Sequence, residues 1–432
     1  MTDDSGTEVK APSGIRGKRW NYGWVVVVAY MAVDSMIHAI GFSLGVFLPP
    51  ITDELGMSLG QAGWLGSFNW MVPALLGIPF ASLLARFPPK RLIAVSILVG
   101  VPFVFLQGWA PNYWVLLVAR VAFMSIVLGR VAARPKLIRQ WFPNKTITIV
   151  NAVLTVGMGA AMATAVFWTG DLIQALDGWR NALYLFASLF ALTGVGWIIL
   201  GRENPTPVHD VAAEVPQQSP IRAVMKYKPL WLLGMGIAGD MLCFGAMETL
   251  WPKLAVQEGI MSLDRASYCL GLTYYGFMIG CLVGGIVSHR IGRRKPLLWL
   301  PGLFLPPLTL AILFSHSFAV LAVLWTVWGL SEVYFPIIWT IPYELRGIKT
   351  GEIAVAGAFV VSMFTAGAAL GPLIAGYIAD AFGSLKLGLA VTCGFPFLLV
   401  IAGILIPETG PAARRKTHID GEGHQASPEE TP

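Results

Sequence analysis

The segment Gly285-Ile-Val-Ser-His-Arg-Ile-Gly-Arg-Arg-Lys295 ends a long apolar run with a dense group of positive charges, and it decides the fold of this chain. A similar segment, Ala81-Ser-Leu-Leu-Ala-Arg-Phe-Pro-Pro-Lys-Arg91, stands 204 positions earlier. Each segment joins the second and third apolar runs of its half of the chain. This internal duplication predicts two structurally similar halves.

The apolar runs around these segments fill most of the chain. Of the 432 residues, 56% are hydrophobic and only 12% are charged, whereas a typical soluble domain has about 25% charged residues. This composition excludes a soluble enzyme. Because a bilayer-spanning helix uses about 20 residues, the length accommodates twelve spans and short loops.

We expect an all-α integral membrane protein with twelve transmembrane helices in two pseudo-symmetric bundles of six. Apolar runs bounded by Pro, Gly and charge place the helices at roughly 22–48, 60–84, 91–109, 113–135, 146–169, 180–200, 229–252, 264–288, 296–314, 318–340, 351–377 and 384–407. The expected bundles comprise residues 20–201 and 229–407, joined by a cytoplasmic linker at 202–228. Residues 1–19 and 408–432 are expected to be disordered cytoplasmic tails.

The basic residues are distributed unequally between the two sides of the membrane. With the N-terminus inside, 24 of the 30 Lys and Arg residues lie in cytoplasmic segments and 4 lie in outside loops, while Arg120 and Arg130 remain within the fourth span. By the positive-inside rule, this predicts a multi-pass protein of the cell membrane with both termini in the cytoplasm. The net charge of +6 therefore encodes orientation, and we expect no nucleic-acid partner.

Several motifs carry a family likeness. Five residues match the GxLaDRxGRR signature of the major facilitator superfamily, namely Gly285, Arg290, Gly292, Arg293 and Arg294. Further landmarks are Asp177-Gly-Trp-Arg180, Pro342-Tyr-Glu-Leu-Arg-Gly347, Gly371-Pro372 with Gly376, and Pro407-Glu-Thr-Gly410. Over about residues 20–410 the chain resembles this superfamily, which implies its fold, solute transport and a monomer. Its sequence as a whole is similar to the organic-anion and cyanate-permease-like branches of the superfamily.

The chain departs from the family signature at one charged position. Where the family has an acidic residue that helps to latch the two halves on the cytoplasmic side, this chain has Ala85 in the first half and His289 in the second. The resemblance makes these neighbouring residues a possible gate or latch: Arg86, His289, Arg290, Arg293 and Arg294. At His289 such a latch is sensitive to pH, and the alternative is a neutral imidazole facing lipid headgroups.

Ionisable residues within the spans mark the candidate site. A charge at the middle of the bilayer costs at least about 2.5–3.5 kcal/mol, so each one requires a partner, a wet cavity or a function. The spans contain Asp34, His38, Arg120, Arg130, Asp240, Glu248 and Glu332. These fall in spans one, four, seven and ten, which line the central cavity in the superfamily. Glu248 has the alternative of snorkelling to the outer surface.

Helical geometry groups the charges of the first half. Asp34 and His38 are four residues apart on one stripe, and Arg120, Arg130 and Arg134 fall on one side of a continuous helix. By analogy with proton-linked members of the superfamily, we expect Asp34 and Arg120 to form a coupling pair. Arg134 is interpreted as a positive-inside anchor.

Neutral side chains complete the predicted cavity. Trp328 lies one turn from Glu332, and Tyr275 in span eight could line a pocket for an organic molecule. Asn69 and Asn151 are polar groups that can hydrogen-bond either substrate or a neighbouring helix. A weaker alternative is a divalent-metal site at Asp34, His38 and Cys243, since imidazole and thiolate bind transition metals.

No motif supports catalysis, because the chain contains no Walker lysine loop, no GxSxG elbow and no metalloprotease helix. We therefore predict no enzyme activity and no cofactor. The expected function is secondary active transport, by symport or antiport and alternating access, of a small organic anion coupled to protons. The alternatives are export of amphipathic cations or drugs, a divalent-metal carrier, and a non-transporting receptor or assembly factor.

Overall fold

The computed structural model describes residues 13–84, 87–204, 225–345, 348 and 350–410. In this part of the chain, 11 helices are long and apolar enough to cross a membrane. A further helix of 26 residues, α3, occupies the remaining expected position at 60–84. The all-α architecture and the span positions are thus confirmed.

The N-terminal half contains α1 (Ser13–Phe42), α2 (Leu44–Leu55), α3 (Leu59–Leu84), α4 (Pro89–Trp109), α5 (Tyr113–Ile126), α6 (Leu128–Trp141), α7 (Asn144–Ala175) and α8 (Trp179–Leu200). The C-terminal half contains α10 (Lys228–Gln257), α11 (Leu263–Ile291), α12 (Pro296–Phe314), α13 (Phe318–Leu330), η1 (Ser331–Tyr334), α14 (Phe335–Ile338), α15 (Ile341–Glu344), α16 (Thr350–Phe382), α17 (Leu385–Thr392) and α18 (Phe397–Leu405).

Four expected spans are interrupted rather than continuous. The first divides at Ser43, the fourth at Val127, the tenth at η1 and the twelfth between α17 and α18. Proline explains the last two interruptions: Pro336 and Pro396 lack an N–H and clash with the carbonyl group four residues earlier. The interruption at Val127 separates Arg120 on α5 from Arg130 on α6.

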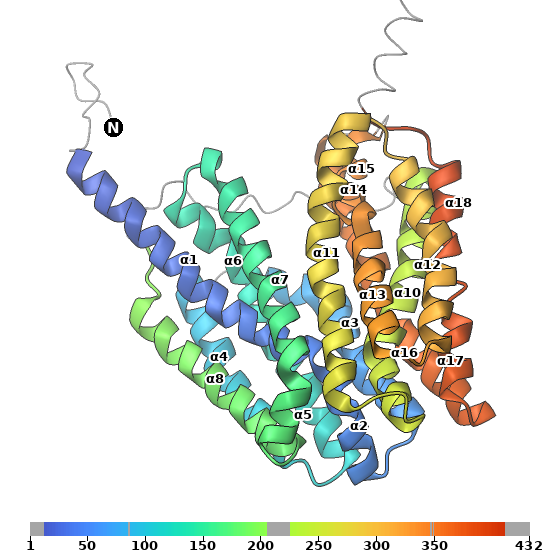
Figure 1. Cartoon of the computed structure of the whole chain (residues 1–432). Helices are drawn as coiled ribbons and strands as arrows, with labels where there is room; N and C mark the ends of the chain where they lie inside the picture. The colour runs from blue at the N-terminus through green and yellow to red at the C-terminus, as the bar shows by residue number, and fades with distance from the viewer. Residues whose placement is uncertain (1–12, 85–86, 205–224, 346–347, 349, 411–432) are drawn as a thin grey trace, which may run out of the picture.

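The helices of the two halves meet at one end and stand apart at the end where the chain begins (Figure 1). The meeting end is formed by α3 with α16, α7 with α11, and α2 with α10. Glycine permits backbone contact there. A Cβ atom added to Gly45 would lie 2.1 Å from the carbonyl oxygen of Glu248, and one added to Gly63 would lie 2.4 Å from that of Pro372.

Polar groups seal the same end. The carboxylate of Asp380 on α16 accepts hydrogen bonds from the backbone N–H groups of Leu59 (2.9 Å) and Gly60 (2.8 Å), at the beginning of α3. One half of the protein thus caps a helix of the other half. Tyr268 donates to Asp171 at 2.7 Å, and Lys253 pairs with Asp53.

The Asp177-Gly-Trp-Arg180 motif fastens three loops at this end. Arg180 donates to Glu54 at 2.8 Å and to the carbonyl oxygens of Gly108 and Ala110, both at 2.9 Å. Trp179 donates to the other oxygen of Glu54 at 2.5 Å. The hydrogen bonds from Arg180 and then Trp179 hold the pKa of the Glu54 carboxyl below its ordinary value of 4.5.

At the opposite end, the signature segment is tied to two other motifs of its own half. Arg294 donates to both oxygens of Glu344, at 2.7 and 3.0 Å, and these bonds raise the pKa of its guanidinium. Glu408 accepts from the backbone N–H of Arg294 at 2.6 Å. The positions from Glu408 to Gly410, which the sequence assigned to a tail, therefore belong to the folded bundle.

The remaining latch residues make no polar contact within the described part of the chain. His289, Arg290 and Arg293 are exposed near the open end, and Arg86 lies outside the described residues. The latch between the halves stays a prediction.

We expect Glu54→Gln to lower the melting temperature at neutral pH. Because the pKa of Glu54 is lowered in the folded state, its ionised form stabilises the fold above about pH 4.5, and this contribution is lost as the pH falls further. The difference from the wild type should therefore shrink in acid, as measured by thermal unfolding. In an Arg180→Gln background the Glu54→Gln substitution should have little effect. A full effect there would contradict the role of Arg180 in stabilising the ionised form of Glu54.

Candidate functional site

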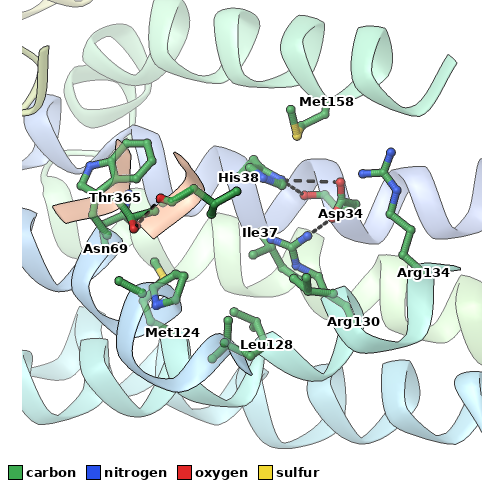
Figure 2. A pocket seen from close by; sticks show the side chains of 18 of the residues that line it. Asp34, Ile37, His38, Asn69, Met124, Leu128, Arg130, Arg134, Met158 and Thr365 are labelled. Atoms are coloured by element: carbon green, nitrogen blue, oxygen red, sulfur yellow. Dashed lines mark hydrogen bonds and ion pairs between the residues drawn. The ribbon is translucent and has the colours of Figure 1, made fainter. Parts of the chain in front are cut away.

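A cavity of about 530 Å³ lies between α1, α3, α5, α6 and α7 of the N-terminal half and α16 of the other half. Its charged lining residues are Asp34, Arg130 and Arg134. His38, Asn69 and Thr365 add polar groups, and Figure 2 shows how these side chains are arranged. Apolar side chains, including Ile37, Leu128 and Met158, cover most of the remaining wall.

Asp34 and Arg130 form an ion pair in the cavity wall. The side chain of Asp34 is 2% exposed and that of Arg130 is 12% exposed, so the pair is largely removed from water. Breaking a buried pair by removing one partner leaves an uncompensated charge, which is strongly destabilising. Each residue therefore constrains the position of the other.

His38 lies one helical turn after Asp34. Its Nδ1 is 2.7 Å from the backbone carbonyl oxygen of Asp34 and 3.7 Å from the carboxylate oxygen Oδ2. Because a carbonyl oxygen only accepts hydrogen bonds, Nδ1 carries the hydrogen in the neutral ring. The nitrogen that remains free to take a proton is Nε2.

Arg134 lines the cavity one turn beyond Arg130. Its Nη2 donates to Oδ1 of Asn151 on α7 at 3.0 Å. No carboxylate pairs with Arg134 among the residues that the structure describes. The positive charge of Arg134 is thus oriented by a neutral amide and left uncompensated. The sequence placed Arg134 on the same side of the helix as Arg130, but it favoured an anchor over a ligand at this position.

Arg120 does not pair with Asp34, and that prediction is wrong. Its guanidinium donates to the carbonyl oxygens of Ile40 (3.2 Å) and Gly41 (2.9 Å), at the end of α1. These carbonyls lie about 10 Å along the helix from Asp34, at 1.5 Å per residue. Arg120 and Arg130 both face α1, but they contact it at different positions along its length.

Arg120 instead organises the deep end of the cavity. It is fully buried, and its Nη2 also approaches Oδ1 of Asn69 at 3.5 Å. Glu248 of α10 is buried nearby, close enough for its charge to act on Arg120. Glu248 therefore does not snorkel to the surface.

Asp240 and Glu332 are buried within the C-terminal half and do not belong to the described cavity lining. Tyr334 donates a hydrogen bond to Asp240, whereas neither oxygen of Glu332 has a hydrogen-bond partner in the described structure. This placement does not support the predicted cavity role of Asp240 and Glu332.

The aromatic candidates also lie elsewhere. Trp328 is buried, donates to Thr309 at 3.1 Å and stacks on Phe244. Tyr275 is 2.9 Å from the hydroxyl of Thr164, across the contact between α11 and α7. The aromatic residues in the cavity wall are Tyr30, Phe42 and Trp70, which the sequence did not single out.

The metal alternative is not supported by the geometry. Cys243 lies in the C-terminal half with its Sγ 3.9 Å from Thr309 Oγ1, away from the cavity that contains Asp34 and His38. In the described ranges, no group of three His, Cys, Asp or Glu side chains could hold a metal ion.

The sequence model of the Major Facilitator Superfamily matches residues 27–345 and 255–429. The chain belongs to the major facilitator superfamily. As a member of this superfamily it is a multi-pass membrane transporter and not an enzyme.

Named relatives within the superfamily are distant but extend over most of the chain. A cis,cis-muconate transport protein of Acinetobacter baylyi is 24% identical over 92% of this chain and 96% of its own. A chloramphenicol resistance protein of Streptomyces lividans is 25% identical, over 83% and 93%. A probable galactarate/D-glucarate transporter of Bacillus subtilis is 22% identical, over 92% and 94%.

A solved structure shows the same fold. It is a bacterial homologue of the human lysosomal transporter Spinster, in an inward-facing and occupied conformation. The TM-score is 0.77 at 15% identity, over 89% of this chain and 97% of the other.

A double-mutant cycle will distinguish the observed ion pair from the expected one. We expect Asp34→Asn and Arg130→Gln to be coupled by about 0.5–3 kcal/mol, because each single variant leaves a buried charge without its partner. Asp34→Asn and Arg120→Gln should be additive within about 0.5 kcal/mol. Thermal unfolding of the purified variants measures both. Strong coupling to Arg120 together with additivity at Arg130 would reverse the assignment.

Proposed function

We propose that the protein is a proton-coupled secondary transporter of a small organic anion carrying a carboxylate. The observation that carries this proposal is the uncompensated guanidinium of Arg134 in the cavity. Guanidinium groups bind carboxylates through two parallel hydrogen bonds, and the interaction is strong where water is largely excluded.

The charge of the cavity favours an anion over a cation. Two arginines and one aspartate line it, so the net charge is positive while His38 is neutral. The acidic residues that could attract a cation, Asp240 and Glu332, lie outside this lining. Export of amphipathic cations therefore has less support than transport of an anion.

The relatives agree with this choice in part. The muconate and galactarate/D-glucarate transporters act on organic acids, as their names state. The chloramphenicol resistance protein is as similar in sequence, so relatedness alone does not choose between the substrate classes. The cavity charge supplies the reason to prefer the acids.

Asp34 is the proposed proton site. When Asp34 is ionised, it occupies the guanidinium of Arg130. A proton on Asp34 removes that competition and leaves Arg130 available to the substrate. Binding of the proton and of the anion are thereby coupled at one arginine.

Alternating access is the proposed mechanism. The two halves separate at the end where the chain begins and are sealed at the other end (Figure 1). With both termini in the cytoplasm of a cell-membrane protein, as the distribution of basic residues predicts, this conformation faces inward. We expect a monomer to perform the cycle.

Counterflow of labelled cis,cis-muconate into proteoliposomes tests the function. We expect Arg134→Gln to weaken the apparent affinity at least about tenfold, because a charge-assisted hydrogen bond contributes about 1.5–3 kcal/mol. Arg139→Gln is the matched control, since Arg139 is exposed on the same helix α6 and lies outside the cavity lining.

Exchange of muconate that is equal in the two variants would refute the role of Arg134. A purified wild type that exchanges neither muconate nor D-glucarate nor any other organic acid would favour the non-transporting receptor or assembly factor.

Asp34→Asn tests the coupling separately. The variant should still exchange muconate by counterflow, which needs no proton gradient. It should fail to accumulate muconate when a proton gradient is imposed. Retention of gradient-driven accumulation in Asp34→Asn would show that the coupling proton binds elsewhere.

A further inference from the structure

We infer that the site is built for dianions: acids whose two anionic groups are bound separately by Arg130 and Arg134. This inference rests on the proposed function and names the substrate class of the same cavity.

The two guanidinium groups are held apart by different helices. Arg130 and Arg134 begin one turn apart on α6, about 6 Å along its axis. The Arg130 side chain reaches Asp34 on α1, whereas the Arg134 side chain reaches Asn151 on α7 (Figure 2). This arrangement offers two anion-binding positions rather than a single clamp.

Charge balance gives the two positions different requirements. A monoanion bound to Arg134 neutralises the site while Asp34 still compensates Arg130, so no proton is needed. A dianion needs both arginines, and the site is then neutral only when it takes up one proton; we assign that proton to Asp34, because ionised Asp34 occupies Arg130. Uptake of a proton on binding is therefore a property of dianions and not of monoanions.

The surroundings of Asp34 provide no second carboxylate that could take the proton, and the other side chain with a free acceptor nitrogen is His38. The titratable or charged side chains around it are Tyr30 and His38 of α1 and Arg130 and Arg134 of α6. The helices α7 and α8 present Asn151 and Trp197 on this side, and neither titrates. Among the described residues, Asp34 is the carboxylate of the cavity.

The wall near the two arginines suits a hydrocarbon chain. Ile37, Leu128, Val131 and Met158 line the cavity there and leave few polar groups for hydroxyl recognition. Specificity then depends on the number of anionic groups, because each guanidinium that lacks an anion loses charge-assisted hydrogen bonds.

The test compares trans,trans-muconate with sorbate, which has the same unsaturated carbon chain but a single carboxylate. Binding to the purified full-length protein is measured by calorimetry at about pH 6 and about pH 8, where ordinary carboxylic acids are ionised. We expect muconate affinity to fall by up to about tenfold per pH unit, the limit for uptake of one proton. Sorbate affinity should change less than about twofold, since its binding takes up no proton.

The variants locate the effect. Asp34→Asn should make muconate binding independent of pH, because the group that takes up the proton is absent. Asp177→Asn is the matched control, because Asp177 is exposed, lies outside the cavity lining and has a positive φ of 54° that asparagine tolerates. It should behave as the wild type does.

The outcomes separate the two proposals. Equal affinity and equal pH dependence for muconate and sorbate would overturn the dianion inference while the transport of organic anions stands. A pH dependence of muconate binding that survives in Asp34→Asn would also overturn it. Failure of both acids to bind would contradict the proposed function itself.

Discussion

Arg120, Arg130 and Arg134 carry positive charges that cannot be removed by deprotonation, and they lie where the surrounding lipid offers no compensation. The N-terminal half is arranged around this constraint. Arg120 is satisfied by backbone carbonyls at the end of α1, Arg130 by a carboxylate and Arg134 by an amide. These three kinds of partner differ in how easily a ligand can replace them at the guanidinium group.

That difference assigns the roles. A carbonyl at a helix end belongs to the fold, so Arg120 is structural and holds the first helix where it is interrupted. An amide is a weak partner for a cation, so Arg134 remains attractive to an anion. The carboxylate of Asp34 is a strong partner that a proton can neutralise. Arg130 is therefore available to an anion only when Asp34 is protonated. In the proposed function, binding and coupling thus follow from the chemistry of the neighbouring residues rather than from the arginines themselves.

The sequence predicted the helices well because the requirement for long apolar runs is local. It predicted Asp34, His38, Asn69 and Arg130 as cavity residues because charge and amide groups are rare in the spans. It failed on pairing, because Arg120 and Arg130 both contact α1 and the sequence does not indicate which of them reaches Asp34. It also placed Glu332 in the cavity, whereas Glu332 is buried at η1, where the tenth span is interrupted. Contacts between side chains of different helices depend on tertiary packing, and the periodicity of one helix does not predict them.

The sealed end of the molecule is closed by hydrogen bonds that water can also make. Asp380 satisfies the first amides of α3 from across the interface, and the neighbouring contacts are hydroxyl–carboxylate and lysine–carboxylate pairs. When the halves part, water replaces each of these partners and no polar group is stranded. An apolar interface of the same area would cost free energy when it became exposed to water. In the proposed alternating-access cycle, the polar contacts of this end therefore exchange their protein partners for water as the end opens.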